Sequence, residues 1–383
     1  MEVSVFELVI RALGGLLGAH TLTGHKVLLE RAADLGARLL PALNTTSKLP
    51  WPKWNLAKGS GGSAGEPTIL AEAGSLQLEY EYLAAQTGDA RFRDLPGATF
   101  DAIQSAGFVG LVPVYLTPPE FTPVRPLASK FALGALADSY YEYLLKQWLQ
   151  RPEEERFKRL WLKTVDEIPS LVVPSLDNEK GTAKAPSLKL LEMKPSGATI
   201  WKMDHLSCFT PAMLVLGLQT LPRRDLVQNG RNTTLLRLAE GITASCAEMW
   251  TSSKSGLAPE FSHVTPRPPY HFLGVPDAGQ HSFLRPETVE SLFHLHRFTG
   301  NEKYRRWGEQ IFRAILAHAK VEDGFASVRD ITSTPTEKLD EMQSFVMAET
   351  FKYLYLLFSP SDALDLERYV LNTEGHPLPR GRL

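Results

Sequence analysis

Eight carboxylates lie inside or beside strongly apolar segments of this 383-residue chain, where an unpaired charge is costly to bury. They are Glu7, Glu72, Asp138, Glu260, Glu287, Glu290, Glu349 and Glu374. A single carboxylate in such a place is more often a helix cap or an ion-pair partner. Eight of them, spread over successive helical segments, indicate a polar cavity inside the core. Glycoside hydrolysis needs such a cavity, because one carboxyl group acts as an acid and another as a base about the sugar.

A metal ion is a further candidate component of that cavity. Thr373 offers hydroxyl and backbone oxygens, which are ligands that Ca²⁺ accepts together with waters. The residues alone do not establish the ion, since the sequence has neither EF-hand spacing nor a cluster of His and Cys. His205, taken by itself, is more often a packed core residue than a catalyst.

Composition excludes two classes of partner. The 41 Lys and Arg are balanced by 43 Asp and Glu, so no polyanion or membrane surface is indicated. Basic stripes interleaved with aromatic residues are also absent, which argues against nucleic acid. We find no run of about 18 apolar residues and expect no membrane-spanning segment. Residues 1–22 are predicted to form a core helix rather than a signal peptide, because Glu7 and Arg11 interrupt them and a basic leader is missing.

The two cysteines and two glycosylation sequons bear on the cellular compartment. Cys208 and Cys246 are the only cysteines, and the residues alone make two buried thiols at least as plausible as a disulfide. The tripeptides that begin at Asn44 and Asn232 fit a secretory protein, although such sequons often occur by chance.

Amphipathic helices alternate with turn-rich loops along the whole chain. Apolar residues at helical spacing predict helices over residues 6–19, 25–43, 69–85, 131–150, 202–218, 235–250, 287–299, 304–320 and 342–358. Loops rich in Pro, Gly and Ser cover residues 48–66 and 174–196, and residues 111–116 alternate weakly as a β-strand would. No second domain is indicated.

A short phrase recurs where helices are expected to end: Leu22-Thr23-Gly24-His25, Gln86-Thr87-Gly88-Asp89 and Phe298-Thr299-Gly300-Asn301. In each, the Gly stands where a helix C-cap needs the left-handed conformation, and a polar residue can start the next helix. This repeat of helical hairpins favours an all-α toroid over an open bundle. An α-solenoid that serves as a scaffold is the alternative.

Several segments stand in a recognisable order along the chain: Val5-Phe6-Glu7 with Ile10-Arg11, Leu13-Gly14-Gly15-Leu16-Leu17, Leu70-Ala71-Glu72 through Gln77-Leu78-Glu79, Ala137-Asp138-Ser139-Tyr140-Tyr141-Glu142-Tyr143, Met203-Asp204-His205-Leu206-Ser207-Cys208-Phe209, Gly256-Leu257-Ala258-Pro259-Glu260, Leu284-Arg285-Pro286-Glu287, Ser344-Phe345 with Ala348-Glu349-Thr350, and Asn372-Thr373-Glu374. Together they resemble the class I α1,2-mannosidases, glycoside hydrolase family 47. The resemblance runs in order from residue 4 to residue 379. It implies an (α/α)7 barrel of helical hairpins with a small β-hairpin element, and a calcium-dependent, inverting hydrolysis of terminal α1,2-linked mannose on high-mannose N-glycans of glycoproteins.

By this resemblance Glu7 corresponds to the general acid, Glu287 to the general base and Asp138 to a third essential carboxylate. Thr373 corresponds to the Ca²⁺ ligand. Substrate-binding positions correspond to Arg11, Glu72, His205, Glu260, Arg285, Glu290, Phe345, Glu349 and Glu374. Cys208 and Cys246 correspond to the disulfide of the processing enzymes, which act in the lumen of the endoplasmic reticulum or the Golgi.

Two departures from the family pattern qualify these expectations. Family members carry further helices ahead of the segment with Glu7, so we expect residues 1–383 to be one catalytic domain whose barrel is incomplete at its N-terminus and has no membrane anchor. Leu136 replaces an Arg of the reticulum-type enzymes. There are two alternatives. One is a lectin-like relative that acts in glycoprotein degradation, although that branch usually lacks the cysteine pair. The other is an inactive truncated form.

Overall fold

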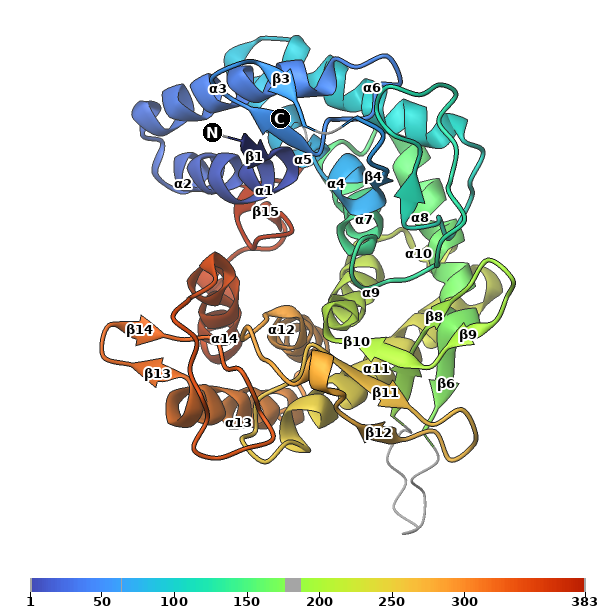
Figure 1. Ribbon diagram of the computed structural model, residues 1–383, viewed down its shortest axis with the longest axis vertical. Helices are drawn as coiled ribbons and strands as arrows, with labels where there is room; N and C mark the ends of the chain where they lie inside the picture. The colour runs from blue at the N-terminus through green and yellow to red at the C-terminus, as the bar shows by residue number, and fades with distance from the viewer. Residues whose placement is uncertain (1, 63, 176–186, 382–383) are drawn as a thin grey trace. The chain divides into compact units, whose positions relative to one another are not determined.

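The structure is a computed structural model that describes residues 2–62, 64–175 and 187–381. Its residues cluster into two compact units, both mainly helical (Figure 1). The N-terminal unit contains residues 1–132, 136–164 and 365–383, and the C-terminal unit contains residues 133–135 and 165–364. Whether the whole chain is one domain stays a prediction.

Helices of the N-terminal unit are joined by short antiparallel ladders. The helices are α1 (Val5–Glu7), η1 (Leu8–Leu13), α2 (Gly14–Thr23), α3 (Lys26–Leu39), η2 (Leu40–Leu43), α4 (Leu70–Gly74), α5 (Gln77–Thr87), α6 (Arg91–Ser105), α7 (Asp138–Gln150) and most of α8 (Glu155–Glu167). The ladders are β1 (Glu2–Ser4) with β2 (Lys53–Asn55) and β3 (Ser60–Gly61), β4 (Thr68–Ile69) with β5 (Tyr115–Leu116), and β15 (Tyr369–Leu371) with β16 (Pro377–Pro379).

The C-terminal unit is built in the same way. Its helices are η3 (Ile168–Leu171), η4 (His205–Phe209), α9 (Thr210–Thr220), α10 (Arg223–Val227), η5 (Gln228–Gly230), α11 (Arg231–Thr251), η6 (Asp277–Gly279), α12 (Glu287–Thr299), α13 (Lys303–His318), η7 (Val346–Thr350), α14 (Phe351–Phe358) and η8 (Ser361–Ala363). Its strands are β6 (Val172–Pro174), β7 (Leu188–Leu190), β8 (Glu192–Met193), β9 (Thr199–Ile200), β10 (Lys202–Asp204), β11 (Phe261–Val264), β12 (Phe272–Gly274), β13 (Lys320–Val321) and β14 (Gly324–Phe325). They pair as β6–β7, β8–β9, β10–β11–β12 and β13–β14.

The recurring Thr-Gly phrase ends a helix in each of its three copies, as predicted. Gly24, Gly88 and Gly300 have φ of 69°, 73° and 67°, and each donates its N–H to the carbonyl four residues earlier. The preceding Thr hydroxyl donates to another carbonyl of the last turn and accepts the N–H two residues ahead. One motif therefore ends one helix and directs the chain into the next.

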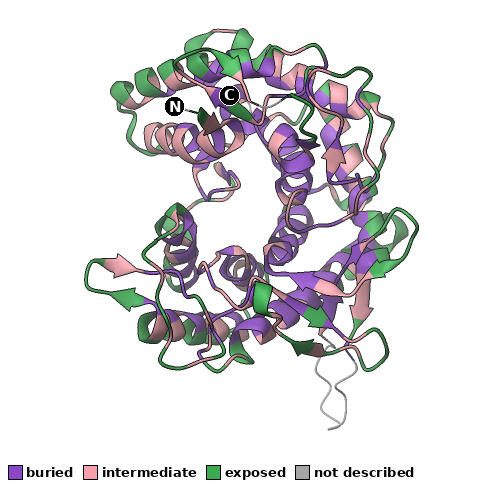
Figure 2. Ribbon diagram, in the orientation of Figure 1, coloured by how far each residue is buried: buried purple, intermediate pink, exposed green. Residues whose placement is uncertain are grey.

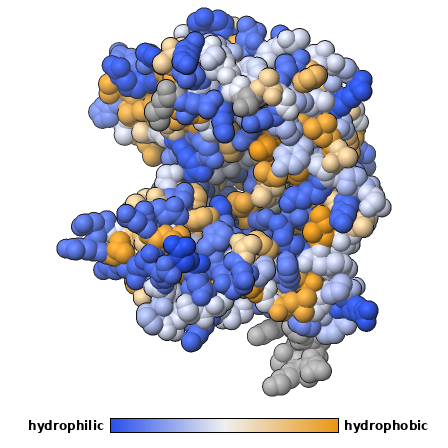
Figure 3. Space-filling model, viewed as in Figure 1, coloured by the Kyte–Doolittle hydropathy of each residue, from blue (hydrophilic) through white to orange (hydrophobic). Residues whose placement is uncertain are grey.

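Helices of the two units differ in how much of their surface is buried. Every residue of α7 after Asp138 is buried, whereas α13 buries a single stripe of residues at helical spacing (Figure 2). In α3 the buried stripe includes Gly36, whose added Cβ would lie 2.6 Å from Leu83 Cδ2, so close packing against α5 requires glycine there. Val27, an apolar residue of the helix predicted over residues 25–43, is 55% exposed. On the visible surface, hydrophilic and apolar residues are interspersed (Figure 3).

Residues Val5–Thr23 form one continuous helical segment that is long and apolar enough to cross a membrane. This differs from the prediction that no segment would qualify, although a core helix or a signal sequence passes the same test of length and composition. Within the N-terminal unit α2 packs on α3, α5 and β16, as the prediction of a core helix requires. Residues 2–4, predicted as helix, form β1 instead.

Several predicted boundaries are wrong because tertiary structure interrupts the helical pattern. The helix predicted over residues 69–85 is broken at Ser75 into α4 and α5, and the one over 131–150 begins only at Asp138. The segment 202–218 contains β10 and η4 before α9 begins. Helices α6 and α8 lie in stretches given no prediction. The predicted loop 174–196 lies partly outside the described residues.

Candidate functional site

In the N-terminal unit one arginine joins two candidate carboxylates. Arg11 Nε donates to Glu7 Oε2 at 2.5 Å, and Arg11 Nη1 donates to Glu374 Oε2 at 2.6 Å. The Ser4 hydroxyl caps the helix by accepting the N–H of Glu7. Arg11 lies in η1, a π-helical turn, and Glu7 directly precedes it. Such turns are frequent at functional sites.

Glu72 adds a carboxyl that holds a proton near neutral pH. Burial, followed by the negative charge of Glu7, raises the pKa of Glu72 to about 7. Its Oε2 atom is buried without a hydrogen-bond partner among the described residues. The structure thus places Glu72 within electrostatic reach of Glu7.

The turn between β15 and β16, residues 372–376, carries Thr373 and Glu374 and is held by buried hydrogen bonds. Asn372 Oδ1 accepts the N–H groups of Glu374 and His376 at 3.0 and 2.8 Å. Asn372 Nδ2 donates to Ile10 O at 2.9 Å and to Glu79 Oε1 at 2.7 Å. This one side chain therefore connects the turn to η1 and α5.

Glu79 and Tyr143 complete that support. The Tyr143 hydroxyl donates to Glu79 Oε1 at 2.6 Å and accepts the Thr373 N–H at 3.4 Å. Burial raises the pKa of Glu79 to about 7, against the opposing effect of the Tyr143 and Asn372 hydrogen bonds. Sequence reasoning assigned no role to Glu79, Tyr143 or Asn372, although all three lie in segments that carry the family resemblance. Glu79 could have been found from the sequence, because it is a carboxylate inside an apolar helical segment.

The Leu13-Gly14-Gly15-Leu16-Leu17 motif lets α2 approach this turn. A Cβ added at Gly14 would lie 2.6 Å from Asn372 Nδ2, whereas one at Gly15 would lie 3.6 Å from His376 Cε1. Only the first distance is shorter than van der Waals contact allows. Glycine at position 14 is therefore needed for α2 to pack against the Asn372 side chain.

In the C-terminal unit His205 lies beside the candidate base Glu287. The indole N–H of Trp250 can only donate, and it donates to His205 Nε2 at 3.1 Å, so the neutral ring carries its proton on Nδ1. Thr288 Oγ1 is 2.9 Å from the same Nε2. His205 Nδ1 lies 3.5 Å from Glu287 Oε2, which is buried and has no hydrogen bond among the described residues.

A second group surrounds Arg285. Its Nε donates to Glu260 Oε2 at 2.5 Å, and its guanidinium lies 5.5 Å from the ring centres of Phe283 and Phe345. Burial lowers the pKa of Arg285, but the carboxylates of Glu260 and Glu287 outweigh burial and raise it. The cation therefore stays charged among the carboxylates it orients.

Two further carboxylates lie on helices of this unit. Glu290 is one turn after Glu287 on α12, and its Oε1 accepts the Tyr353 hydroxyl at 3.3 Å. Glu349 is 5% exposed and lies in η7, a second π-helical turn. Each unit thus carries candidate residues on or next to a π-helical turn.

Two leucines in the left-handed region precede candidate carboxylates. Leu136, with φ of 80°, comes two residues before Asp138, and Leu284, with φ of 60°, comes three before Glu287. For a residue with a branched side chain this conformation is strained, and such strain clusters at functional sites. The Leu284 carbonyl is held by the Thr350 hydroxyl at 2.7 Å, and the Leu136 carbonyl by the Ala71 N–H at 3.0 Å.

The remaining predicted positions are also located. Asp138 begins α7 and accepts the N–H of Ser139 at 2.8 Å. Cys208 and Cys246 form a disulfide between η4 and α11, which confirms the pairing implied by the resemblance. No group of three or more His, Cys, Asp and Glu side chains able to hold a metal occurs in the described part of the chain.

Comparison with known proteins shows the family of the chain. The model of glycosyl hydrolase family 47 matches residues 1–380. The mannosyl-oligosaccharide 1,2-alpha-mannosidase of Arabidopsis thaliana is 36% identical over 388 residues, which cover 98% of this chain and 64% of the relative. The endoplasmic reticulum mannosyl-oligosaccharide 1,2-alpha-mannosidase of Homo sapiens is 36% identical over 389 residues, covering 99% and 53%. The chain thus spans between about half and two thirds of the length of these relatives.

A solved structure of alpha-1,2-mannosidase from Trichoderma reesei superposes with a TM-score of 0.84 at 25% identity, covering 99% of this chain and 82% of that one. The structure of D-mannose isomerase superposes with a TM-score of 0.60 at 13% identity, covering 93% of this chain and 87% of that one. This likeness shows a shared fold alone. The predicted all-α fold of the (α/α)7 barrel class is confirmed.

Proposed function

Because the chain belongs to glycosyl hydrolase family 47, we propose that it hydrolyses terminal α1,2-linked mannose from high-mannose N-glycans with inversion. The observation that carries the proposal is Glu287 Oε2, which is buried, lies 3.5 Å from His205 Nδ1 and has no hydrogen bond among the described residues. Relatives from Arabidopsis thaliana and Homo sapiens are named as enzymes of this specificity.

Glu287 is proposed as the general base. It is the first residue of α12, where the helix N-terminus favours a negative charge. His205 presents its Nδ1 proton toward this carboxylate and so helps to orient it. The opposite edge of the imidazole is fixed at Nε2 by Trp250 and Thr288, which prevents the ring from flipping.

Glu7 is proposed as the general acid. Arg11 is shared between Glu7 and Glu374, so its charge is divided over two carboxylates. Glu72, whose pKa is raised to about 7, holds a proton near Glu7 at neutral pH and can resupply it after turnover. Asp138 is the third proposed catalytic carboxylate. The other predicted substrate-binding residues would hydrogen-bond or stack on the sugar.

The residues of the 372–376 turn fit a calcium ion. Thr373 provides a hydroxyl and a carbonyl on a backbone fixed by Tyr143 and Asn372, and Glu79 Oε2 is a buried, unpartnered oxygen nearby. With no carboxylate cage among the described residues, Thr373 and bound waters would hold the ion. When bound, Ca²⁺ would fix vicinal sugar hydroxyls and stabilise charge in the transition state.

We place this activity in the secretory pathway, in the lumen of the endoplasmic reticulum or the Golgi. Relatives from Homo sapiens and Rattus norvegicus are named as endoplasmic reticulum enzymes. The Cys208–Cys246 disulfide fits an oxidising compartment, and the sequon residues Asn44 and Asn232 are both exposed.

The base assignment is tested by Glu287→Gln. A neutral amide cannot activate water, so release of mannose from a nine-mannose glycan should fall at least ~10³-fold while glycan binding persists. Glu309→Gln is the matched control, because Glu309 pairs only with the exposed Arg313 on the outer face of α13. Normal turnover in Glu287→Gln would refute the assignment. Binding without turnover in the unmodified chain would support the lectin-like alternative instead.

A further inference from the structure

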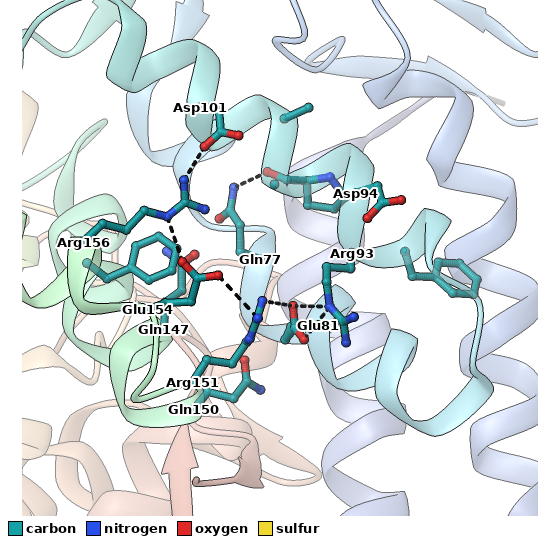
Figure 4. Close-up of a pocket in the computed structure, with 15 residues that line it drawn as sticks. Gln77, Glu81, Arg93, Asp94, Asp101, Gln147, Gln150, Arg151, Glu154 and Arg156 are labelled. Atoms are coloured by element: carbon teal, nitrogen blue, oxygen red, sulfur yellow. Dashed lines mark hydrogen bonds and ion pairs between the residues drawn. The ribbon is translucent and has the colours of Figure 1, made fainter. Parts of the chain in front are cut away.

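A polar pocket of about 300 Å³ lies among α5, α6, α7 and the start of α8 (Figure 4). All its lining residues belong to the N-terminal unit. Gln147 and Gln150 contribute from the last turn of α7, whereas Asp138 begins that helix. At 1.5 Å per residue this separation is roughly 14 Å or more, so the α7 wall of the pocket is distinct from Asp138, and none of the candidate catalytic residues lines the pocket.

Three buried glutamines form part of the wall. Gln77, Gln147 and Gln150 are 6%, 4% and 1% exposed. The amide of Gln77 donates to Ala73 O and Pro96 O, and that of Gln150 donates to the backbone of α5. Gln147 Nε2, in contrast, is buried without a hydrogen-bond partner among the described residues. A buried amide N–H of this kind requires an acceptor that the protein itself does not supply.

The charges around the pocket compensate one another. Three arginines and four carboxylates line it: Arg93, Arg151, Arg156, Glu81, Asp94, Asp101 and Glu154. Each arginine is already ion-paired, as the dashed lines in Figure 4 show for Arg93 with Glu81 and for Arg156 with Asp101. These ion pairs neutralise the charge of the arginines, which disfavours an anion. The paired carboxylates keep further lone pairs, to which a neutral hydroxyl can donate.

Part of the wall is apolar and open. Pro96, Gly97, Ala98 and Phe157 line it, and a Cβ added at Gly97 would meet nothing within 4 Å. The volume is at the lower end of the range for small-molecule sites, about 300–1,000 Å³. A compact ring with an apolar face and several hydroxyls matches a pocket of this size and polarity.

We propose that this pocket is a second carbohydrate site, which binds one neutral saccharide ring through a hydrogen bond from Gln147 Nε2 to a ring or hydroxyl oxygen. The neighbouring carboxylates accept hydrogen bonds from the sugar hydroxyls, and the Pro96 to Ala98 wall contacts the apolar face of the ring. The proposal rests on the pocket alone and holds whether or not the chain is an active mannosidase.

Titration calorimetry with methyl α-D-mannopyranoside and N-acetyl-D-glucosamine tests the proposal. Gly97→Phe fills the open side of the pocket, and its matched control Gly97→Ala adds only a Cβ for which space exists. Gln147→Leu keeps the side-chain volume but removes the donor. Thermal melting of every variant verifies folding.

At least one of the two saccharides should bind to the unmodified chain and to Gly97→Ala. Gly97→Phe should lose one binding site per chain, and Gln147→Leu should weaken that site about tenfold. Mannose release should be unchanged in Gln147→Leu, which separates this site from the proposed catalytic one. If Gly97→Phe does not fold, Gln147→Leu decides. Identical isotherms for Gln147→Leu and the unmodified chain, or binding of phosphate in place of both saccharides, would overturn the proposal.

Discussion

Replacement of Gly14 by alanine tests how the turn with Thr373 and Glu374 is positioned. The new Cβ would lie 2.6 Å from Asn372 Nδ2. That nitrogen cannot move freely, because it donates to Ile10 O and to Glu79 Oε1. The clash must therefore displace either α2 or the turn.

Magnitudes follow from two opposing effects. Overpacking a well-packed site costs about 1–3 kcal/mol. Alanine in place of glycine within a helix stabilises by about 1 kcal/mol. Gly14→Ala should therefore lower the free energy of unfolding by about 0–2 kcal/mol. Gly15→Ala, whose Cβ would lie 3.6 Å from His376 Cε1, should raise it by about 1 kcal/mol.

Urea denaturation and mannose release measure the two consequences. The variants should differ by about 1–3 kcal/mol in the free energy of unfolding. Displacement of the turn by even ~1 Å should reduce turnover by Gly14→Ala about 10²-fold, with Gly15→Ala unaffected. Equal stability and equal turnover in the two variants would refute the view that Gly14 positions this turn.

Three further perturbations have defined outcomes. Because burial raises the pKa of Glu79 to about 7 from 4.5, its protonated form stabilises the fold below pH 4.5 and this contribution, about 3 kcal/mol, is lost as pH rises through 7. Glu79→Gln should abolish that difference in urea denaturation at pH 4.5 and pH 8, and an unchanged pH dependence would contradict it. Replacement of Cys208 and Cys246 by serine opens a loop of 38 residues and should lower the free energy of unfolding by about 4 kcal/mol; no loss would contradict the chain-entropy account. Leu136→Arg, which provides a planar hydrogen-bonding fork, should change trimming of a nine-mannose glycan from several branches toward one eight-mannose isomer. Accumulation of that isomer by the unmodified chain as well would show that Leu136 does not govern branch choice.

Helix ends and candidate carboxylates were predictable because their signals are local. The Thr-Gly phrase forms its hydrogen bonds within a few residues, so the sequence places Gly24, Gly88 and Gly300 at helix ends correctly. A carboxylate such as Glu349 in an apolar segment is conspicuous for a similar reason. Its cost of burial can be inferred without knowledge of the fold.

Other features depend on partners that are distant in the sequence. Glu79 and Asn372 are 293 residues apart, and no periodicity relates them. The π-helical turns η1 and η7 change the hydrogen-bond pattern but keep the apolar spacing of a helix. Their sequences therefore cannot be distinguished from those of an ordinary α-helix. Strands of two to four residues are too short to establish an alternating pattern. The break at Ser75, in contrast, does have a local signal, because Gly74 and Ser75 are residues at which helices commonly break.

The central proposal is that this chain acts as an inverting, calcium-dependent α1,2-mannosidase. Proton NMR during hydrolysis of α1,2-linked mannobiose tests it directly, because the anomer released first reports the stereochemistry before mutarotation. The account predicts β-mannose as the initial product, no release in the presence of a chelator, and recovery when Ca²⁺ is restored. Initial α-mannose, or release that continues unchanged with the chelator, would contradict it.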